Sequence, residues 1–138
     1  LEKVFGKKYR YLGVEADSVV AFWAKKYLLP ELASPVELHE GDAFEFVANC
    51  EKQFDLIVMD VFLDDQVPEQ FEREVFLQNL KKCLKTNGLL IYNRLTDTPE
   101  LEQRASDFFE NTFRKVFPAA STLDLGVNRM LLSRAKCG

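Results

Sequence analysis

Glycine is scarce in this 138-residue chain, and its six copies never fall into a G-x-G-x-x-G pattern. In dinucleotide-dependent oxidoreductases, that pattern lets the backbone approach the pyrophosphate closely. Its absence argues against that class of enzyme.

Cysteine and histidine are rarer still. Cys50, Cys83 and Cys137 are far apart and form no C-x-x-C pair, so the sequence indicates neither a disulfide framework nor a zinc site. The single histidine, His39, has no cysteine or serine partner close to it in the sequence. A half-exposed strand position is therefore a better interpretation of His39 than a general base.

Long apolar runs are also missing. No window approaches the roughly 18 consecutive apolar residues that a membrane-spanning helix needs, and the first residues lack the basic-then-apolar pattern of a signal peptide. We therefore expect no membrane segment and a cytoplasmic location. The net charge of −4 argues against nucleic acid as a partner, so small-molecule or protein substrates fit better.

The chain does contain enough apolar residues, 47%, to build a core, and its length predicts one domain over residues 1–138. Helix-like and strand-like patterns alternate with short breaks, which is typical of a sheet built from βαβ units. The expected strands are 10–15, 36–40, 54–59 and 89–93. Helices are expected to begin near residue 18, residue 43, residue 69 or 73, and residue 98. Residues 1–8 end an earlier helix, and 120–125 with 129–133 form an antiparallel hairpin.

Two segments carry expectations about burial. The run 54–59 is broken only by Asp55, which predicts a central parallel strand covered on both faces. Phe22, Trp23 and Tyr27 fall at helical spacing and are expected to lie in the core.

Acidic residues end two of the expected strands: Glu15 and Asp17 end the first, and Asp60 ends the third. In an open α/β sheet, ligands bind in the crevice outside the carboxyl ends of the strands, where acids can reach the hydroxyls and amines of a nucleotide-like ligand. We expect the function to lie at this edge. Asp17 is better interpreted as the cap of the following helix.

Four motifs occur in order along the chain: Val14-Glu15-Ala16-Asp17, Gly41-Asp42-Ala43, Phe54-Asp55-Leu56-Ile57-Val58-Met59-Asp60 and Asn87-Gly88-Leu89-Leu90-Ile91-Tyr92-Asn93. Together they resemble the class I S-adenosylmethionine-dependent methyltransferase fold, and in particular its spermidine-synthase-like branch. The resemblance covers nearly the whole chain. It implies a Rossmann-like α/β fold, with a mostly parallel sheet, helices on both faces and a C-terminal antiparallel hairpin.

One part of that fold is not found in the sequence. Proteins that the chain resembles open with a strand and a glycine-rich loop that packs against the cofactor, whereas this sequence begins within the following helix. The first strand, which is missing, belongs between the strands that end in Glu15 and Asp60. We expect a gap there, filled by another chain or by a segment of a parent protein, and association of copies through the exposed sheet edges. Direct pairing of these two strands would contradict the expectation.

The resemblance also implies which residues bind the cofactor, S-adenosylmethionine or its decarboxylated form. Glu15 is expected to accept hydrogen bonds from both ribose hydroxyls, because two donors need two acceptor oxygens. Asp42 and Ala43 are expected to contact the adenine edge. Each acid has a structural alternative: Glu15 as a charge at a helix N-terminus, and Asp42 as a turn and cap residue.

Asp60 is implied to be the catalytic residue. In spermidine synthases, the corresponding aspartate accepts a proton from the attacking amine, and a second acid three positions later holds the diamine. Leu63 occupies that position in this chain, so the substrate-binding candidates are the next acids, Asp64 and Asp65, together with Tyr92. The alternative is that Asp60 is a structural acid at the end of a strand.

The departure at Leu63 places methyl transfer narrowly ahead of aminopropyl transfer to a diamine, because methyl transfer depends mainly on positioning. Aminopropyl transfer from decarboxylated S-adenosylmethionine is the alternative. A third hypothesis, favoured by the missing glycine-rich loop, is a non-catalytic association module or an inactive fragment.

Overall fold

The computed structural model describes residues 6, 8–63 and 66–135. Contacts along the chain divide it into two compact units, Leu1–Asn49 and Cys50–Gly138. Asp64, Asp65 and most of the helix end expected at 1–8 lie outside the described residues. No helix in the described part of the chain is long and apolar enough to cross a membrane.

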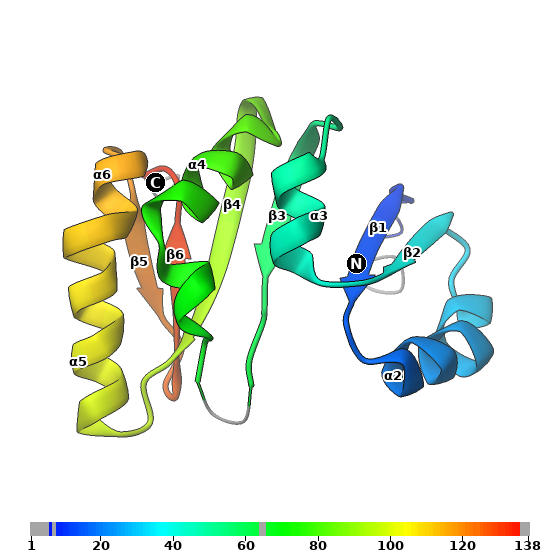
Figure 1. Cartoon of the computed structure of the whole chain (residues 1–138), viewed down its shortest axis with the longest axis horizontal. Coiled ribbons are helices and arrows are strands. Elements are labelled where there is room, and N and C mark those ends of the chain that lie inside the picture. Colours follow the sequence, from blue (N-terminus) through cyan, green and yellow to red (C-terminus); the bar gives the residue numbers. More distant parts are fainter. Residues whose placement is uncertain (1–5, 7, 64–65, 136–138) are drawn as a thin grey trace. The chain divides into compact units, whose positions relative to one another are not determined.

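The first unit holds two parallel strands. β1 (Tyr11–Glu15) pairs with β2 (Val36–Glu40), in a register that sets Glu15 beside Glu40. The connection between them contains α2 (Ser18–Trp23), a π-helical turn η1 (Ala24–Leu28) and a 3₁₀ turn η2 (Leu29–Glu31), and α3 (Ala43–Asn49) follows β2 (Figure 1). The strands expected at 10–15 and 36–40 and the helices expected to begin near residues 18 and 43 are thus confirmed.

Asp17 caps α2, as expected, since its carboxylate accepts hydrogen bonds from the backbone amides of Val19 at 2.7 Å and Val20 at 3.2 Å. The expected burial of the aromatic residues is wrong: Phe22, Trp23 and Tyr27 are 54%, 50% and 53% exposed. Helical spacing places the rings on one face, but this small unit does not cover that face. Trp23 instead stacks on Tyr27 with a centroid distance of 5.1 Å.

The second unit holds a four-stranded sheet in the order β3–β4–β6–β5. β3 (Phe54–Met59) is parallel to β4 (Leu84–Leu95), whereas β6 (Asn128–Leu132) is antiparallel to both β4 and β5 (Ser121–Asp124). The helical elements are η3 (Glu69–Glu72), α4 (Glu74–Lys82), α5 (Pro99–Phe108), the π-helical turn η4 (Phe109–Phe113) and α6 (Arg114–Val116). Figure 1 shows α4, α5 and α6 on one face of this sheet.

Local sequence signals correctly predict the C-terminal hairpin but not the start of β4. The expected hairpin is confirmed, and its turn contains Gly126 at φ 74°, a conformation that glycine adopts without strain. The strand expected at 89–93 begins earlier than predicted, because β4 already starts at Leu84 and pairs there with Phe54. Gly88 has a packing role, since a Cβ at this position would lie 2.9 Å from the carbonyl oxygen of Phe54.

The core of the second unit lies between the sheet and its helices. Along β4, Leu90, Tyr92 and Arg94 are buried, while the alternate residues Ile91 and Asn93 are half-buried. This alternation follows from the two-residue period of a strand. The largest fully buried side chains beside Leu90 and Tyr92 are Phe76, Leu77, Leu80, Phe113, Val116 and Leu131.

The far face of the sheet departs from expectation. β3 was expected to be central and covered on both faces, but it pairs with β4 on one side, and Leu56 and Val58 are 45% and 58% exposed. The described helices of this unit share one face, so the expected cover on both faces is not seen within it. β1 and β3 belong to different sheets, and no pairing joins these two strands, which were expected to flank a gap. The α/β Rossmann-like architecture with a C-terminal antiparallel hairpin is confirmed.

Candidate functional site

Asp60 directly follows β3, at the carboxyl end of the parallel pair β3–β4. The register sets Met59 beside Tyr92, so the next residues of the two strands, Asp60 and Asn93, lie beside each other on the opposite face. Asn93 Nδ2 donates a hydrogen bond to Asp60 Oδ1 at 2.9 Å. The expected catalytic acid is thus exposed, but it is held by a half-buried amide on the neighbouring strand.

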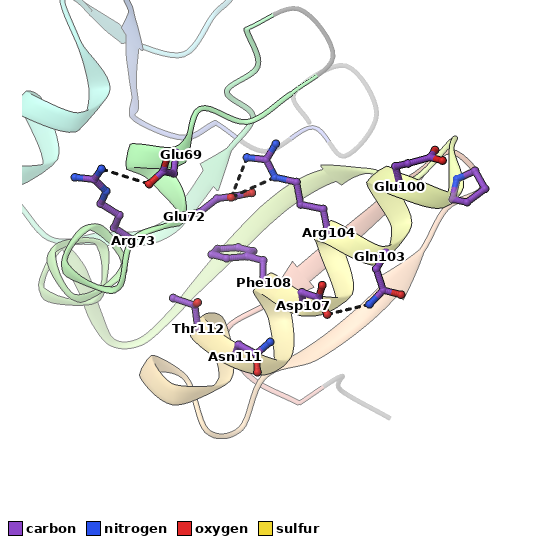
Figure 2. Close-up of a pocket in the computed structure, with 11 residues that line it drawn as sticks. Glu69, Glu72, Arg73, Glu100, Gln103, Arg104, Asp107, Phe108, Asn111 and Thr112 are labelled. Carbon is purple, nitrogen blue, oxygen red and sulfur yellow. Dashed lines mark hydrogen bonds and ion pairs between the residues drawn. The ribbon is translucent and has the colours of Figure 1, made fainter.

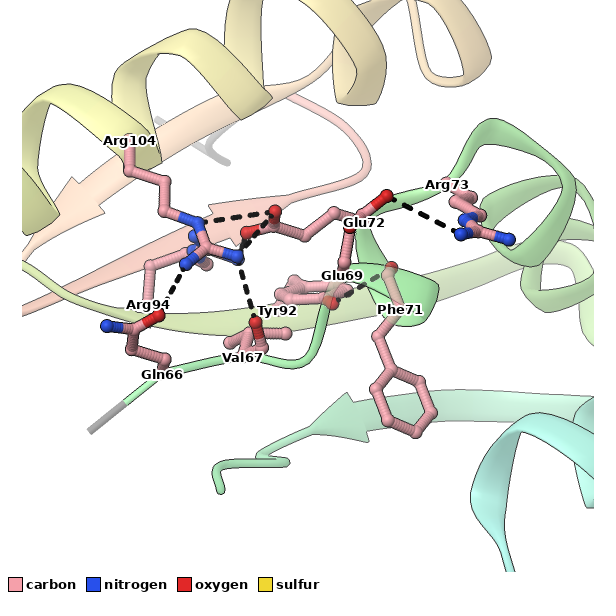
Figure 3. Close-up of polar contacts among 9 residues, drawn as sticks. All are labelled: Gln66, Val67, Glu69, Phe71, Glu72, Arg73, Tyr92, Arg94 and Arg104. Atoms are coloured by element: carbon pink, nitrogen blue, oxygen red, sulfur yellow. Dashed lines mark hydrogen bonds and ion pairs between the residues drawn. The ribbon is translucent and has the colours of Figure 1, made fainter. Parts of the chain in front are cut away.

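The segment that follows Asp60 is anchored to the sheet and to α5. Tyr92 donates its hydroxyl hydrogen to the carbonyl oxygen of Phe71 at 3.1 Å. Arg104 on α5 donates to Gln66 Oε1 at 2.8 Å and to the carbonyl oxygen of Val67 at 3.1 Å (Figure 3). The described end of this loop, residues 66–72, is therefore fixed in place.

A buried ion-pair network reinforces this anchor. Glu72 pairs with Arg94 at 2.5 Å and with Arg104 at 3.0 Å. Arg94 is 3% exposed, and its guanidinium lies 5.0 Å from the ring centroid of Phe108. A buried charge is tolerated only when it is paired, so the buried Arg94 guanidinium depends on Glu72 as its counter-charge.

Sequence reasoning missed Glu72, Arg94 and Arg104. One signal could have found Arg94: it follows Leu90 and Tyr92 at the two-residue spacing that marks the core-facing side of β4. No pattern in the sequence identifies its partner Glu72, because η3 is a single short turn reached through a loop.

Tyr92 was expected to contact substrate, and the structure places it elsewhere. Its side chain is 1% exposed and packs against Phe108 and Phe113. Burial raises the pKa of Tyr92 above its usual range, so the hydroxyl stays protonated and donates to Phe71. The residue points into the core because strand alternation puts it on the helix-covered face. Asp64 and Asp65 lie outside the described residues.

The cofactor candidates Glu15, Asp42 and Ala43 belong to the first unit. Glu15 and Asp42 lie at the carboxyl ends of β1 and β2, and the amide of Gly41 donates to the carbonyl oxygen of Glu15 at 2.9 Å. Ala43 is the first residue of α3, half-buried, beside Asp42. The sheet therefore brings the three candidates to one edge.

Both acids also serve the local backbone. Glu15 Oε1 accepts a hydrogen bond from the amide of Asp17 at 2.8 Å, and Asp42 Oδ1 accepts one from the amide of Phe44 at 2.6 Å. The second oxygens, Glu15 Oε2 and Asp42 Oδ2, accept no hydrogen bond from the residues that the structure describes. These acceptor oxygens thus fit a nucleoside, which presents hydroxyl and amine hydrogens to them.

A groove of about 790 Å³ lies elsewhere in the second unit, between η3 and the helical stretch from α5 to η4 (Figure 2). Two ion pairs, Glu69–Arg73 and Glu72–Arg104, cross or border it. Its lining includes Phe108, on the helix-covered side of the sheet, whereas Asp60 and Asn93 lie on the other side. Of the site residues predicted from sequence, none that the structure describes lines this groove.

Comparison with known families gives a direct match. The spermine/spermidine synthase domain matches residues 8–127. The chain belongs to this family. A polyamine aminopropyltransferase from Vibrio vulnificus is 27% identical over 123 residues, which cover 87% of this chain and 40% of that protein.

Solved structures show the same fold. A probable spermidine synthase from Corynebacterium glutamicum superposes with a TM-score of 0.74 at 18% identity, covering 91% of this chain and 55% of that one. Human methyltransferase-like protein 13, solved in complex with SAH, superposes with a TM-score of 0.71 at 18% identity, covering 98% of this chain and 75% of that one. This family member therefore has the fold that spermidine synthases and methyltransferases share. It spans about 40% of the length of the curated relative that it matches.

Proposed function

We propose that this spermine/spermidine synthase family member takes part in aminopropyl transfer from decarboxylated S-adenosylmethionine to an amine. The observation that carries the proposal is the exposed Asp60 carboxylate, held by Asn93 at the carboxyl end of a parallel strand pair in a chain of this family. Asp60 is the catalytic residue in the proposal. Glu15, Asp42 and Ala43 hold the nucleoside of the donor, and Asp64 and Asp65 hold the acceptor.

The chemistry is a displacement at carbon. The acceptor nitrogen attacks the aminopropyl carbon bonded to the sulfonium, a new C–N bond forms, and the C–S bond breaks. The electron pair of that bond stays on sulfur, which leaves as the neutral thioether methylthioadenosine. The nitrogen that has gained a carbon must lose a proton, and a carboxylate within hydrogen-bond reach can accept it.

Methyl transfer is the second candidate, and two observations favour it. Leu63 occupies the position where the aminopropyltransferase pattern has a second acid, and a methyltransferase-like protein shares the fold. The sequence alone placed methyl transfer first. The family match and the similarity to a polyamine aminopropyltransferase now favour aminopropyl transfer.

The leaving groups separate the two candidates. We would incubate the protein with putrescine or spermidine and either decarboxylated S-adenosylmethionine or S-adenosylmethionine, and quantify the nucleoside products by mass spectrometry. Methylthioadenosine formed only when an amine is present supports aminopropyl transfer. S-adenosylhomocysteine would show methyl transfer instead, and the absence of both products would favour a non-catalytic association module or an inactive fragment.

Asp60→Asn tests the assigned catalytic role, because it preserves size and removes the proton acceptor. We expect kcat to fall about 10²–10⁴-fold, the usual contribution of a general base. Asp55→Asn is the matched control: Asp55 lies near the other end of β3 and is paired with Lys85 at 2.8 Å. Equal losses in the two variants would show that Asp60 has no special part in the reaction.

Glu15→Gln tests the assigned nucleoside contact. We expect weaker donor binding, by about 10–150-fold, because losing a charge-assisted hydrogen bond costs about 1.5–3 kcal/mol. Isothermal titration with decarboxylated S-adenosylmethionine measures the change, and Glu45→Gln on α3 is the control within the same unit. An unchanged dissociation constant would restrict Glu15 to its backbone contact with Asp17.

A further inference from the structure

The side chain of Asn93 contacts Asp60, and this contact sets the direction of the carboxylate. Asn93 Nδ2 donates to Asp60 Oδ1 at 2.9 Å, and Asp60 accepts no other hydrogen bond from the part of the chain that the structure describes. Asp60 is otherwise exposed. An exposed aspartate can occupy several rotamers, so a single bond from a strand residue selects among them.

Stability does not explain an asparagine at this position. Asn93 Oδ1 is buried and accepts no hydrogen bond from the described residues. A buried acceptor without a donor costs about 1–3 kcal/mol. Leucine has the same number of side-chain heavy atoms and the same branch at Cγ, and it would avoid that cost on a sheet face that already carries Val58 and Ile91.

Unpaired buried polar groups of this kind occur at functional sites more than elsewhere, because there the side chain serves the site rather than the stability of the fold. An amide of this kind has one orientation in which it donates to the carboxylate, since its oxygen would repel Asp60. The orphaned Oδ1 is the consequence of that orientation. The hydrogen bond to Asp60 and the unpaired Oδ1 both indicate that the contact with Asp60 explains an asparagine at position 93.

We propose that Asn93 is a positioning residue: its amide holds the Asp60 carboxylate in the orientation that takes the proton from the acceptor nitrogen. The inference rests on the proposed function and adds to it a residue that acts only through Asp60. A base displaced by about 1 Å loses on the order of 10²-fold in rate, so one hydrogen bond is sufficient for an effect of this size.

The decisive variant is Asn93→Leu, because a positioning role and a structural role predict opposite results. We expect kcat to fall about 10–100-fold, KM for donor and acceptor to stay within about twofold, and the urea midpoint of unfolding to stay the same or rise. A structural role predicts lower stability together with a general loss of activity. Asn128→Leu is the control, since Asn128 is a half-buried strand asparagine on β6 and should leave kcat unchanged.

A double-mutant cycle then shows whether Asn93 acts through Asp60. In an Asp60→Ala background, Asn93→Leu should have almost no further effect on kcat, because the group that it positions is absent. Additive losses would overturn the inference, as would an unchanged kcat in the single variant. If the unsubstituted protein forms no transfer product, the proposed function fails and this inference fails with it; an active protein that tolerates Asn93→Leu overturns this inference alone.

Discussion

Cys83 lies where α4 ends and β4 begins, and its neighbours decide how its thiol behaves. The side chain is 2% exposed, and Sγ lies 3.8 Å from the carbonyl oxygen of Cys50. Burial is the main cause that raises the pKa of the Cys83 thiol from 9.0 to about 11, and the neighbouring Cys50 contributes to this shift. The folded protein therefore keeps this thiol neutral at pH values where an unfolded chain would ionise it.

This shift predicts a pH-dependent stability. Because the folded pKa is raised, the contribution of Cys83 is fully present below about pH 9 and is lost as pH rises towards 11. The gap in unfolding free energy between the unsubstituted protein and Cys83→Ala should therefore narrow over this range. Urea titrations at pH 8, 9.5 and 10.5 measure it, with Leu80→Ala as a buried, non-titrating control on the same helix. A gap that stays constant for both variants would contradict the prediction.

Single residues also show how far local chemistry can be predicted. Asp17 was expected to cap a helix and does so, because capping needs only the backbone amides two and three residues later. Tyr92 was expected near substrate and lies in the core. Its environment depends on which face of β4 the helices cover, and that cannot be predicted from its neighbours in the sequence.

At the scale of elements, the side chain of Glu72 links η3 to two other elements. Glu72 joins this turn to β4 through Arg94 and to α5 through Arg104. Glu69, three residues earlier, pairs with Arg73 at 3.4 Å, but both side chains are largely exposed. The two acids can therefore be compared directly, since the Glu72 side chain is 16% exposed and the Glu69 side chain is 81% exposed.

Glu72→Gln should cost about 3–5 kcal/mol of unfolding free energy, because it leaves the buried Arg94 guanidinium without a counter-charge. Glu69→Gln should cost less than about 1 kcal/mol, since an exposed ion pair contributes little. Chemical denaturation of both variants gives the comparison. Similar losses would mean that the network of Glu72 does not hold η3 in place.

At the scale of the whole molecule, apolar burial is distributed unevenly between the two units. Among the described apolar residues that are buried, Ala21 alone belongs to Leu1–Asn49, and all the others belong to Cys50–Gly138. Since apolar burial is the main favourable term in folding, the second unit should hold most of the stability.

Hydrogen exchange tests this difference. We expect the amides of β1 and β2 to exchange much faster than those of β4 and β6, because regions with few buried contacts open at low free-energy cost. Mass spectrometry of peptides from both units measures the rates. Uniform protection across the chain would show that the units unfold together.

Association of copies through exposed sheet edges and a cytoplasmic location remain predictions.

The sequence by itself determined the features that depend on near neighbours. Strand period, helix caps and turn glycines are encoded within a few residues, so β1, β2, β3, the start of α5 and the hairpin were predicted. The acids that end the strands were found for the same reason. The family resemblance, carried by four short motifs, was confirmed by the domain match.

The tertiary structure decided which faces are covered and which distant residues meet. The exposure of Phe22 and Val58 depends on what lies against them, and the partners Glu72–Arg94 and Asp60–Asn93 are separated by 22 and 33 residues along the chain. Such contacts arise when the chain folds back on itself, and a local pattern carries no information about them. Periodicity can identify the apolar side of an element, but the cover on that side comes from other segments of the chain.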